Sequence, residues 1–298
     1  MKIMAKPLPT TVVGSYPAVK AKGFKSLLNP YKEALEIAVS DQIDAGIDII
    51  STGQIRGDMI STILSRLPGI NGQEVRGLIK PASGPITVSD TKYALSKHGK
   101  VKAMFAGPST LAHALKINTP MYRNRDEIIP DLAQSLIQEA GYLQDTGITM
   151  LQIDEPILST GIANMNVAYE SLSAIAGSVR VPVCLHVCGN IDNIIDFLLK
   201  MPIDVIDLEF ANNPDNIETI SKNEIKNKII GYGVVDSADD SIESVGTIVS
   251  RIEKGVDHLG PDKIIIDPDC GLRMHERAVA FGKLKNMVEA ADTVRLEL

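Results

Sequence analysis

The residues in this sequence best suited to hold a metal ion are a histidine and a cysteine two positions apart. His186 and Cys188 stand near the end of the apolar stretch 181–188, which predicts a buried strand that ends in a turn. Alternate residues of a strand share a face, so the two side chains point the same way, with Cα atoms roughly 6.6 Å apart. Imidazole and thiolate are ligands that zinc prefers. The pair alone also fits a core cysteine beside a hydrogen-bonded histidine.

The elements that would position this pair repeat along the chain. Eight short apolar segments predict strands, several of them running into a turn: 10–17, 47–53, 100–105, 148–153, 181–190, 205–210, 228–236 and 263–271. Segments with helical spacing separate most of them: 32–45, from 110, 125–145, 168–177, 191–200, 242–259 and 276–291. Short apolar runs are typical of parallel strands covered on both faces. The alternation predicts an α/β fold, a (β/α)8 TIM barrel that forms a single domain over residues 1–298.

One long segment interrupts the alternation. Residues 54–99 contain a predicted helix at 59–66 and then chain punctuated by glycine and proline, with strand-like pieces. Excursions of this length in a compact domain are typical of lids and binding loops. An open doubly wound sheet is the alternative to the barrel. Because no Gly-x-Gly-x-x-Gly turn follows the first strand, a dinucleotide site has no support.

A barrel would bring further ligands to the His-x-Cys pair, since active-site residues lie at the C-terminal ends of its strands. Glu209 ends the sixth predicted strand and Cys270 follows the eighth. With His186 and Cys188 they would supply one nitrogen, two sulfurs and one oxygen, a complete tetrahedral shell for Zn²⁺. Each residue alone fits a structural role, but their convergence favours the metal site. Cys184 lies one pleat deeper, where barrels are packed, and we expect it in the core.

Composition excludes several classes of protein. The chain is 44% hydrophobic and 22% charged, which is ordinary for a globular protein, and its net charge of −7 argues against nucleic acid as a partner. No apolar run approaches the length of a membrane span. Three cysteines, an odd number, argue against a disulfide framework. We expect a cytoplasmic protein with reduced thiols.

Further motifs resemble those of the cobalamin-independent methionine synthase family. Beside the residues above they are Val13-Gly14-Ser15, Gly107-Pro108-Ser109-Thr110, Gln152-Ile153-Asp154-Glu155-Pro156 and Asp267-Pro268-Asp269-Cys270-Gly271-Leu272. The similarity spans nearly the whole chain and keeps the motifs in family order. It is closest to the short archaeal-type form, which corresponds to the catalytic C-terminal barrel of the long enzymes. The resemblance implies a methyltransferase of methionine biosynthesis that methylates the thiol of L-homocysteine.

The resemblance also implies roles for individual residues. The family's zinc ligands match His186, Cys188, Glu209 and Cys270, and its homocysteine-binding positions match Val13, Gly14, Ser15 and Asp154. A family glutamate after the second strand matches best at Gln54. Asp154 would pair with the substrate ammonium, and the amides of Gly14 and Ser15 would receive its carboxylate. Zinc deprotonates a bound thiol, and Glu209, as the hardest donor, is the expected labile ligand. No catalytic residue is expected beyond the zinc site.

The methyl donor is the point at which this chain departs from the long enzymes. Those enzymes use methyltetrahydrofolate, a poor leaving group that needs a proton. The family's proposed proton source, a histidine after the seventh strand, matches Ala238 here, and the chain has no tryptophan for the family's folate site. A methylated corrinoid needs no proton, because its cobalt departs as Co(I). We therefore expect methylcobalamin or a methylated corrinoid protein as the donor.

Two other classes stay open. The corrinoid:coenzyme M methyltransferases of the uroporphyrinogen decarboxylase-like group have a similar barrel with a His-x-Cys zinc site. Their acceptor is a sulfonate without an amino group, whereas the acidic Asp154 favours an amino-acid acceptor. The chain could also be a noncatalytic zinc protein or a binding module for a corrinoid protein. A ligand position that can open argues against that class.

Overall fold

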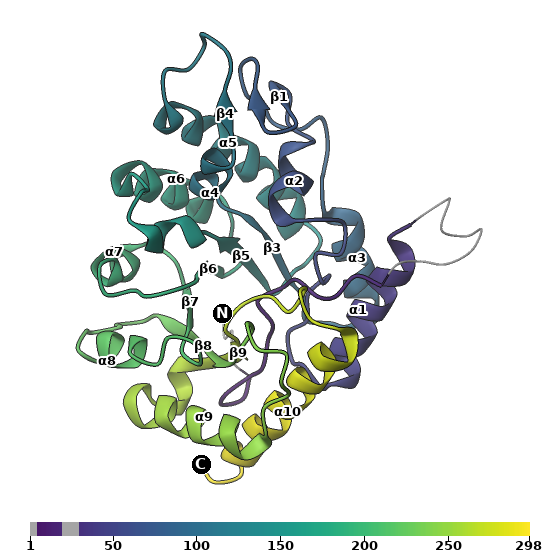
Figure 1. Ribbon diagram of the computed structural model, residues 1–298, viewed down its shortest axis with the longest axis vertical. Coiled ribbons are helices and arrows are strands. Elements are labelled where there is room, and N and C mark those ends of the chain that lie inside the picture. The colour runs from purple at the N-terminus through teal and green to yellow at the C-terminus, as the bar shows by residue number, and fades with distance from the viewer. Residues whose placement is uncertain (1–4, 20–29) are drawn as a thin grey trace.

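Six parallel strands form the continuous part of the structure, a computed structural model that describes residues 5–19 and 30–298 (Figure 1). In spatial order they are β3 (Lys102–Ala106), β5 (Met150–Asp154), β6 (Val183–Val187), β7 (Val205–Glu209), β8 (Ile229–Val235) and β9 (Ile264–Pro268). Nearly all of their residues are buried. Burial on both faces explains why the sequence of each strand is almost continuously apolar.

Two further segments close this sheet into a barrel through single bridges. Thr10 pairs with Ile266, Thr11 with Ile49, and Ile50 with Val101. The (β/α)8 barrel is therefore confirmed, but the extended strands predicted at 10–17 and 47–53 are wrong. Pro9 and Pro17 bracket the first segment and donate no backbone hydrogen bond, so its ladder stays short. The second segment ends at Gly53, whose φ of +75° turns the chain out of the sheet.

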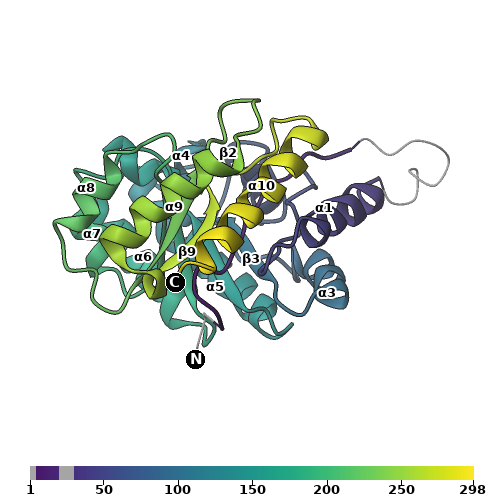
Figure 2. The same cartoon turned by 90° about the horizontal axis from the view of Figure 1, so that it is seen from below.

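Helices cover the outside of the barrel, as Figures 1 and 2 show from two directions. They are α1 (Lys32–Asp44), α3 (Val88–Lys97), α4 (Pro108–His113), α5 (Arg125–Gln144), α6 (Met165–Gly177), α7 (Ile195–Lys200), α8 (Asn216–Ser221), α9 (Val245–Leu259) and α10 (Arg277–Arg295), with 3-10 turns η2 (Pro156–Thr160) and η3 (Pro261–Lys263). Some begin away from the predicted residue because a side chain caps them. Ser244 caps α9, so that helix begins at Val245 rather than at 242. None of the helices among the described residues is long and apolar enough to cross a membrane.

Residues 54–99 contain more regular structure than the sequence predicts. They form α2 (Met59–Leu64), β1 (Ile70–Asn71), β2 (Glu74–Val75) and α3. Strand β2 pairs with β4 (Lys116–Ile117) from outside the segment, which gives a small separate sheet. Helix α3 contacts α1 and α5 and so belongs to the outer ring. The predicted strand-like pieces are thus confirmed as β1 and β2, whereas helix α3 was not predicted.

The barrel interior changes from apolar to polar along its axis. Met150, Cys184, Val205 and Ile265 form a small apolar cluster inside the barrel, separate from the large core between strands and helices. Cys184 thus lies in the core, as expected. Further along the same strands, toward their C-terminal ends, the buried residues are polar or charged, among them Gln152, His186, Asp207 and Asp267. The apolar cluster seals this polar interior on one side.

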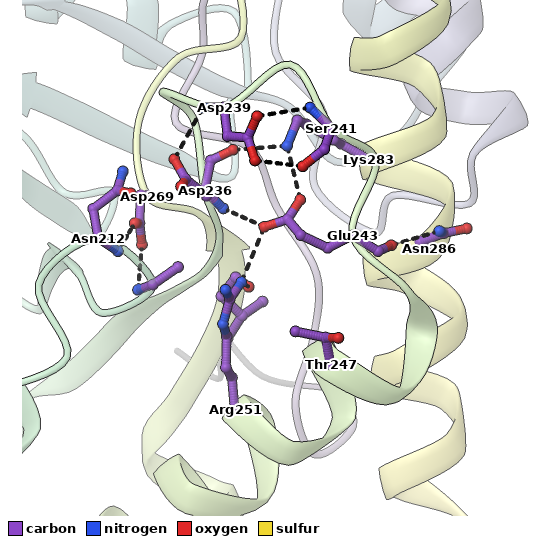
Figure 3. A network of polar contacts seen from close by, with 12 residues as sticks. Asn212, Asp236, Asp239, Ser241, Glu243, Thr247, Arg251, Asp269, Lys283 and Asn286 are labelled. Atoms are coloured by element: carbon purple, nitrogen blue, oxygen red, sulfur yellow. Dashed lines mark hydrogen bonds and ion pairs between the residues drawn. The ribbon is translucent and has the colours of Figure 1, made fainter.

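A buried ion pair holds the loop between β8 and α9. The ammonium of Lys283 on α10 is fully buried, lies 2.7 Å from a Glu243 carboxylate oxygen, and donates to the carbonyl of Asp236 at 2.9 Å (Figure 3). Glu243 also accepts from the amide of Asp236 and from Arg251. Although burial alone would raise it, these hydrogen bonds hold the pKa of Glu243 below its usual value. The two ends of the loop, Asp236 and Glu243, are therefore held together directly after the C-terminal end of β8.

We expect Lys283→Met to lower the free energy of unfolding by about 3 kcal/mol, because it leaves the buried carboxylate of Glu243 without its ammonium partner. Lys285→Met on the same helix is the matched control. Lys285 is exposed, and we expect that change to cost less than about 0.5 kcal/mol. Urea unfolding of both variants measures the difference. Equal stabilities would show that the ion pair does not hold the loop.

Candidate metal centre

Three side chains from two distant parts of the chain meet at the C-terminal end of the barrel. His186 lies in β6, Cys188 directly follows that strand, and Cys270 follows β9. Their potential ligand atoms all lie within 4.8 Å of one another. The Nε2 atom of His186 is 3.0 Å from the sulfur of Cys188, and the two sulfurs are 3.4 Å apart. Both cysteines are free, so the cluster offers one nitrogen and two sulfurs to a metal ion.

The electrostatics of the cluster prepare it for a cation. A hydrogen bond joins the sulfurs of Cys188 and Cys270 and lowers the pKa of Cys270 to about 4, and His186 acts in the same direction. The same bond, together with burial, raises the pKa of Cys188. One of the two sulfurs is therefore a thiolate at neutral pH, and a thiolate is the form that binds metal.

The structure does not bring Glu209, the predicted fourth ligand, into this set of three. Glu209 ends β7 and is 9% exposed. Its Oε2 accepts from the amide of Gly189 at 3.0 Å and from the side chain of Asn213 at 2.6 Å. Burial raises the pKa of Glu209, and the nearby charge of Cys270 raises it further. The carboxylate therefore lies beside the cluster, where Gly189 and Asn213 hold it by hydrogen bonds.

Asp154 lies next to the cluster, at the end of β5 and in register with His186 on β6. Its side chain is almost fully buried and accepts from Gln152 at 2.6 Å. The same amide nitrogen of Gln152 donates to the carbonyl of Val13 at 2.7 Å. Burial raises the pKa of Asp154 to about 6, so the carboxylate is ionised at neutral pH. Gln152 thus ties two of the predicted substrate-binding residues together.

The predicted turn at residues 13–15 packs on the segment that carries Cys270. The amide of Leu272 donates to the carbonyl of Ser15 at 2.8 Å. A Cβ added to Gly271 would lie 1.9 Å from the hydroxyl of Ser15, and one added to Gly14 would lie 1.9 Å from the sulfur of Met104. A side chain at either position would have to displace Ser15 or Met104, so glycine lets the turn and the segment approach closely. The turn and the metal cluster therefore occupy the same side of the barrel mouth.

Gln54 occupies a different place from the other predicted substrate-binding residues. It lines a cavity with Arg56, Asp90, Met104 and other residues, and that cavity includes no member of the metal cluster. Its backbone has a φ of +45°, and its carbonyl accepts a hydrogen bond from Arg273. Met104 also contacts the turn at Gly14, so the cavity lies next to the turn.

Two acidic residues fix the backbone at the C-terminal end of the barrel, and the sequence alone does not indicate their roles. Asp269 accepts from the amides of Phe210, Ala211 and Asn212 and thereby fixes the chain directly after Glu209 (Figure 3). Glu155 accepts from the amides of Ser109 and Thr110 at the start of α4. Burial raises the pKa of each carboxyl group to about 7. Both residues lie inside motifs that resemble those of the family, but nothing in the sequence indicates which backbone amides their carboxyl groups accept from.

Comparison with known proteins agrees with this geometry. A family model described as "Cobalamin-independent synthase, Catalytic domain" matches residues 8–293. A methionine synthase of Methanothermobacter marburgensis is 42% identical over 306 residues, which covers 95% of this chain and 98% of that relative. A methionine synthase of Methanocaldococcus jannaschii is 39% identical over 311 residues, and the alignment covers 96% of this chain and 99% of that relative.

A solved structure shares the fold. The B12-independent methionine synthase from a Shewanella species, solved in complex with selenomethionine, has a TM-score of 0.85 at 23% identity and covers 98% of both chains. A likeness at this identity shows the barrel fold alone. The family match and the archaeal relatives carry the assignment further. The chain belongs to the cobalamin-independent methionine synthase family, as a short form that corresponds to its catalytic domain, and is an enzyme of the methyltransferase class.

Proposed function

We propose that this protein transfers a methyl group to the thiol of L-homocysteine and so forms methionine, at a zinc ion held by His186, Cys188 and Cys270. The observation that carries the proposal is the convergence of these three side chains within 4.8 Å in a member of this family. The curated relatives are named methionine synthases, and the Shewanella structure holds selenomethionine, an analogue of the proposed product.

The donor set fits zinc better than a hard cation such as magnesium, because it contains one imidazole and two thiols. Glu209 is the proposed fourth ligand. Its present partners, Gly189 and Asn213, can hold the carboxylate beside the cluster whenever it leaves the ion. When bound, zinc supplies a Lewis acid that keeps the substrate sulfur deprotonated at neutral pH.

The neighbouring residues fit the amino-acid end of homocysteine. The buried carboxylate of Asp154 is placed to pair with the substrate ammonium, while Gln152 holds it in position. Gly14 and Ser15, with Val13 before them, offer backbone amides to the substrate carboxylate. Gln54 belongs to the proposed substrate site only through its cavity beside the turn. These residues orient the sulfur toward the mouth, where the donor must arrive.

We propose a methylated corrinoid, carried by a partner protein, as the methyl donor. The corrinoid would be a substrate and not a resident cofactor. The loop that carries Ala238 contains acidic residues held by backbone amides. Asp236 accepts from the amides of Ala238 and Asp239. Asp239 in turn accepts from the hydroxyl and the amide of Ser241, which lowers the pKa of Asp239. A carboxyl group with a lowered pKa is a poor proton donor, and a folate donor requires a proton on its leaving group.

We expect the zinc-loaded protein to form methionine from homocysteine faster with methylcobalamin than with methyltetrahydrofolate. The comparison uses equal donor concentrations and measures methionine directly. Coenzyme M in place of homocysteine is the control acceptor, and we expect little methylation of it, because it lacks the ammonium that Asp154 would bind. Faster turnover with the folate would contradict the proposed donor, and preferential methylation of coenzyme M would contradict the proposed acceptor.

A further inference from the structure

The imidazole of His186 is held between the metal cluster and a buried carboxylate. Its Nε2 lies 3.0 Å from the sulfur of Cys188, and its Nδ1 lies 3.3 Å from Oδ1 of Asp207. Both side chains are buried, at 2% and 1% exposure. A metal-binding histidine that gives its second N–H to a carboxylate has a fixed tautomer and a fixed ring orientation. Asp207 therefore determines which nitrogen of His186 is offered to a metal.

Asp207 is itself fixed by the neighbouring strand. It stands on β7 opposite Gly231 of β8. A Cβ added to Gly231 would lie 2.8 Å from both Cβ and Cγ of Asp207, so only glycine leaves room for this side chain. Asp267 of β9 also lies close to Asp207, and the two carboxyl groups act on each other electrostatically.

Neither carboxyl oxygen of Asp207 makes a hydrogen bond among the described residues. The contact of its Oδ1 with Nδ1 of His186 is an ion-pair contact at 3.3 Å. Asp267 is a second buried acid close by, and burial, followed by the charge of Asp207, raises its pKa well above its usual range. Asp207 thus has no competing hydrogen bond that would hold it away from His186.

A lysine supplies the balancing charge. Lys102, the first residue of β3, is fully buried, and its ammonium has no hydrogen-bond partner among residues 5–19 and 30–298. Its positive charge acts through space on Asp267, Cys184 and Asp154, lowering the pKa of each. A buried ammonium persists only where a nearby negative charge compensates it. Asp154, on which Lys102 acts and which is ionised at neutral pH, contributes to that charge.

We propose that Asp207 is a positioning residue that holds the imidazole of His186 with Nε2 toward the two cysteines. This inference rests on the proposed function, because it assumes that the cluster binds a metal ion. It predicts that metal affinity depends on Asp207 beyond the contribution of Asp207 to folding. A merely structural polar core would affect stability and leave the affinity of the folded protein unchanged.

The test uses Co²⁺ as a probe of the metal site in the full-length protein. Its dissociation constant is measured by competition with a chelator, and thiolate-to-cobalt absorption reports the ligand geometry. We expect Asp207→Asn to weaken Co²⁺ binding by about 10–100-fold and to change the absorption, because an amide can donate to Nδ1 and favour the wrong tautomer. Asp267→Asn is the matched variant, because it makes the same change in the neighbouring buried acid, which is not the residue at Nδ1 of His186. We expect the affinity of this variant to stay within about threefold of the unsubstituted protein.

A double variant separates positioning from folding. Asp207→Asn removes a buried carboxyl group from the interior that also holds the ammonium of Lys102, so it is also expected to lower Tm. Lys102→Met combined with Asp207→Asn removes both charges, and we expect it to recover Tm while Co²⁺ binding stays weak. Recovery of affinity together with Tm would overturn the proposal, as would equal losses in Asp207→Asn and Asp267→Asn.

The two proposals fail in different ways. If the unsubstituted protein binds Co²⁺ and methylates homocysteine while Asp207→Asn binds Co²⁺ equally well, the positioning role is wrong and the proposed function stands. If the protein binds Co²⁺ with the expected dependence on Asp207 but does not methylate homocysteine, the positioning role stands and the proposed acceptor is wrong. A protein that binds neither Co²⁺ nor Zn²⁺ overturns both.

Discussion

Cys270→Ser and Cys188→Ser are each expected to remove zinc from the protein and to reduce methyl transfer to background. Each change replaces a soft sulfur donor with a hydroxyl that stays protonated at neutral pH, so the ion loses one of three clustered ligands. Loss of Cys270 also removes the sulfur whose pKa is lowered to about 4, which is the thiolate already present in the cluster. Zinc content after dialysis and the rate of methionine formation measure the two effects.

Cys184→Ser is the matched control for these variants. Cys184 faces the same interior but belongs to the apolar cluster with Met150, Val205 and Ile265. Burying a hydroxyl there costs about 1–3 kcal/mol of stability, and we expect zinc content to remain at that of the unsubstituted protein. Zinc loss in Cys184→Ser combined with zinc retention in Cys188→Ser would show that the metal lies one pleat deeper in the barrel than proposed.

Asp154→Asn is expected to leave zinc in place and to impair the use of homocysteine. The change removes a buried charge-assisted contact to the substrate ammonium, worth about 1.5–3 kcal/mol, so we expect kcat/KM to fall by about 10–150-fold. Zinc content is the internal control, because Asp154 is not among the clustered ligands. An unchanged kcat/KM in the zinc-loaded variant would remove Asp154 from the substrate site.

The same carboxylate predicts a pH dependence. Burial raises the pKa of Asp154 to about 6, so it is ionised above that pH and becomes neutral as the pH falls through it. Because the ammonium of homocysteine binds the ionised form, KM should rise as the pH falls below about 6. Asp154→Asn has no such group, and its KM should lack this change. The same pH profile in both proteins would assign the titration to another residue.

Sequence patterns predicted most of this fold because each signal is local. Apolar runs indicated the six strands of the continuous sheet within a few residues, and helical spacing indicated the outer helices. The same patterns failed at residues 10–17 and 47–53, which join the barrel through single bridges. Those pairings depend on which distant segment lies alongside, and no local pattern records that.

The candidate site divides in the same way. Residue types and barrel topology determined that His186, Cys188 and Cys270 would converge, because strand ends of a closed parallel sheet meet at one mouth. Only the tertiary structure could decide which of the potential ligand atoms lie close enough together to bind one metal ion. It placed Glu209 on Gly189 and Asn213, outside the cluster of three.

The residues behind the site depended wholly on tertiary structure. Asp207 and Asp267 are far apart in the chain, and their roles follow from the register of β7, β8 and β9 and from the space at Gly231. The sequence by itself determined which residue types can bind a metal ion and at which strand ends they lie. Only the packed barrel decided which buried charges compensate one another, because that depends on distances of a few ångströms between segments that the sequence does not relate.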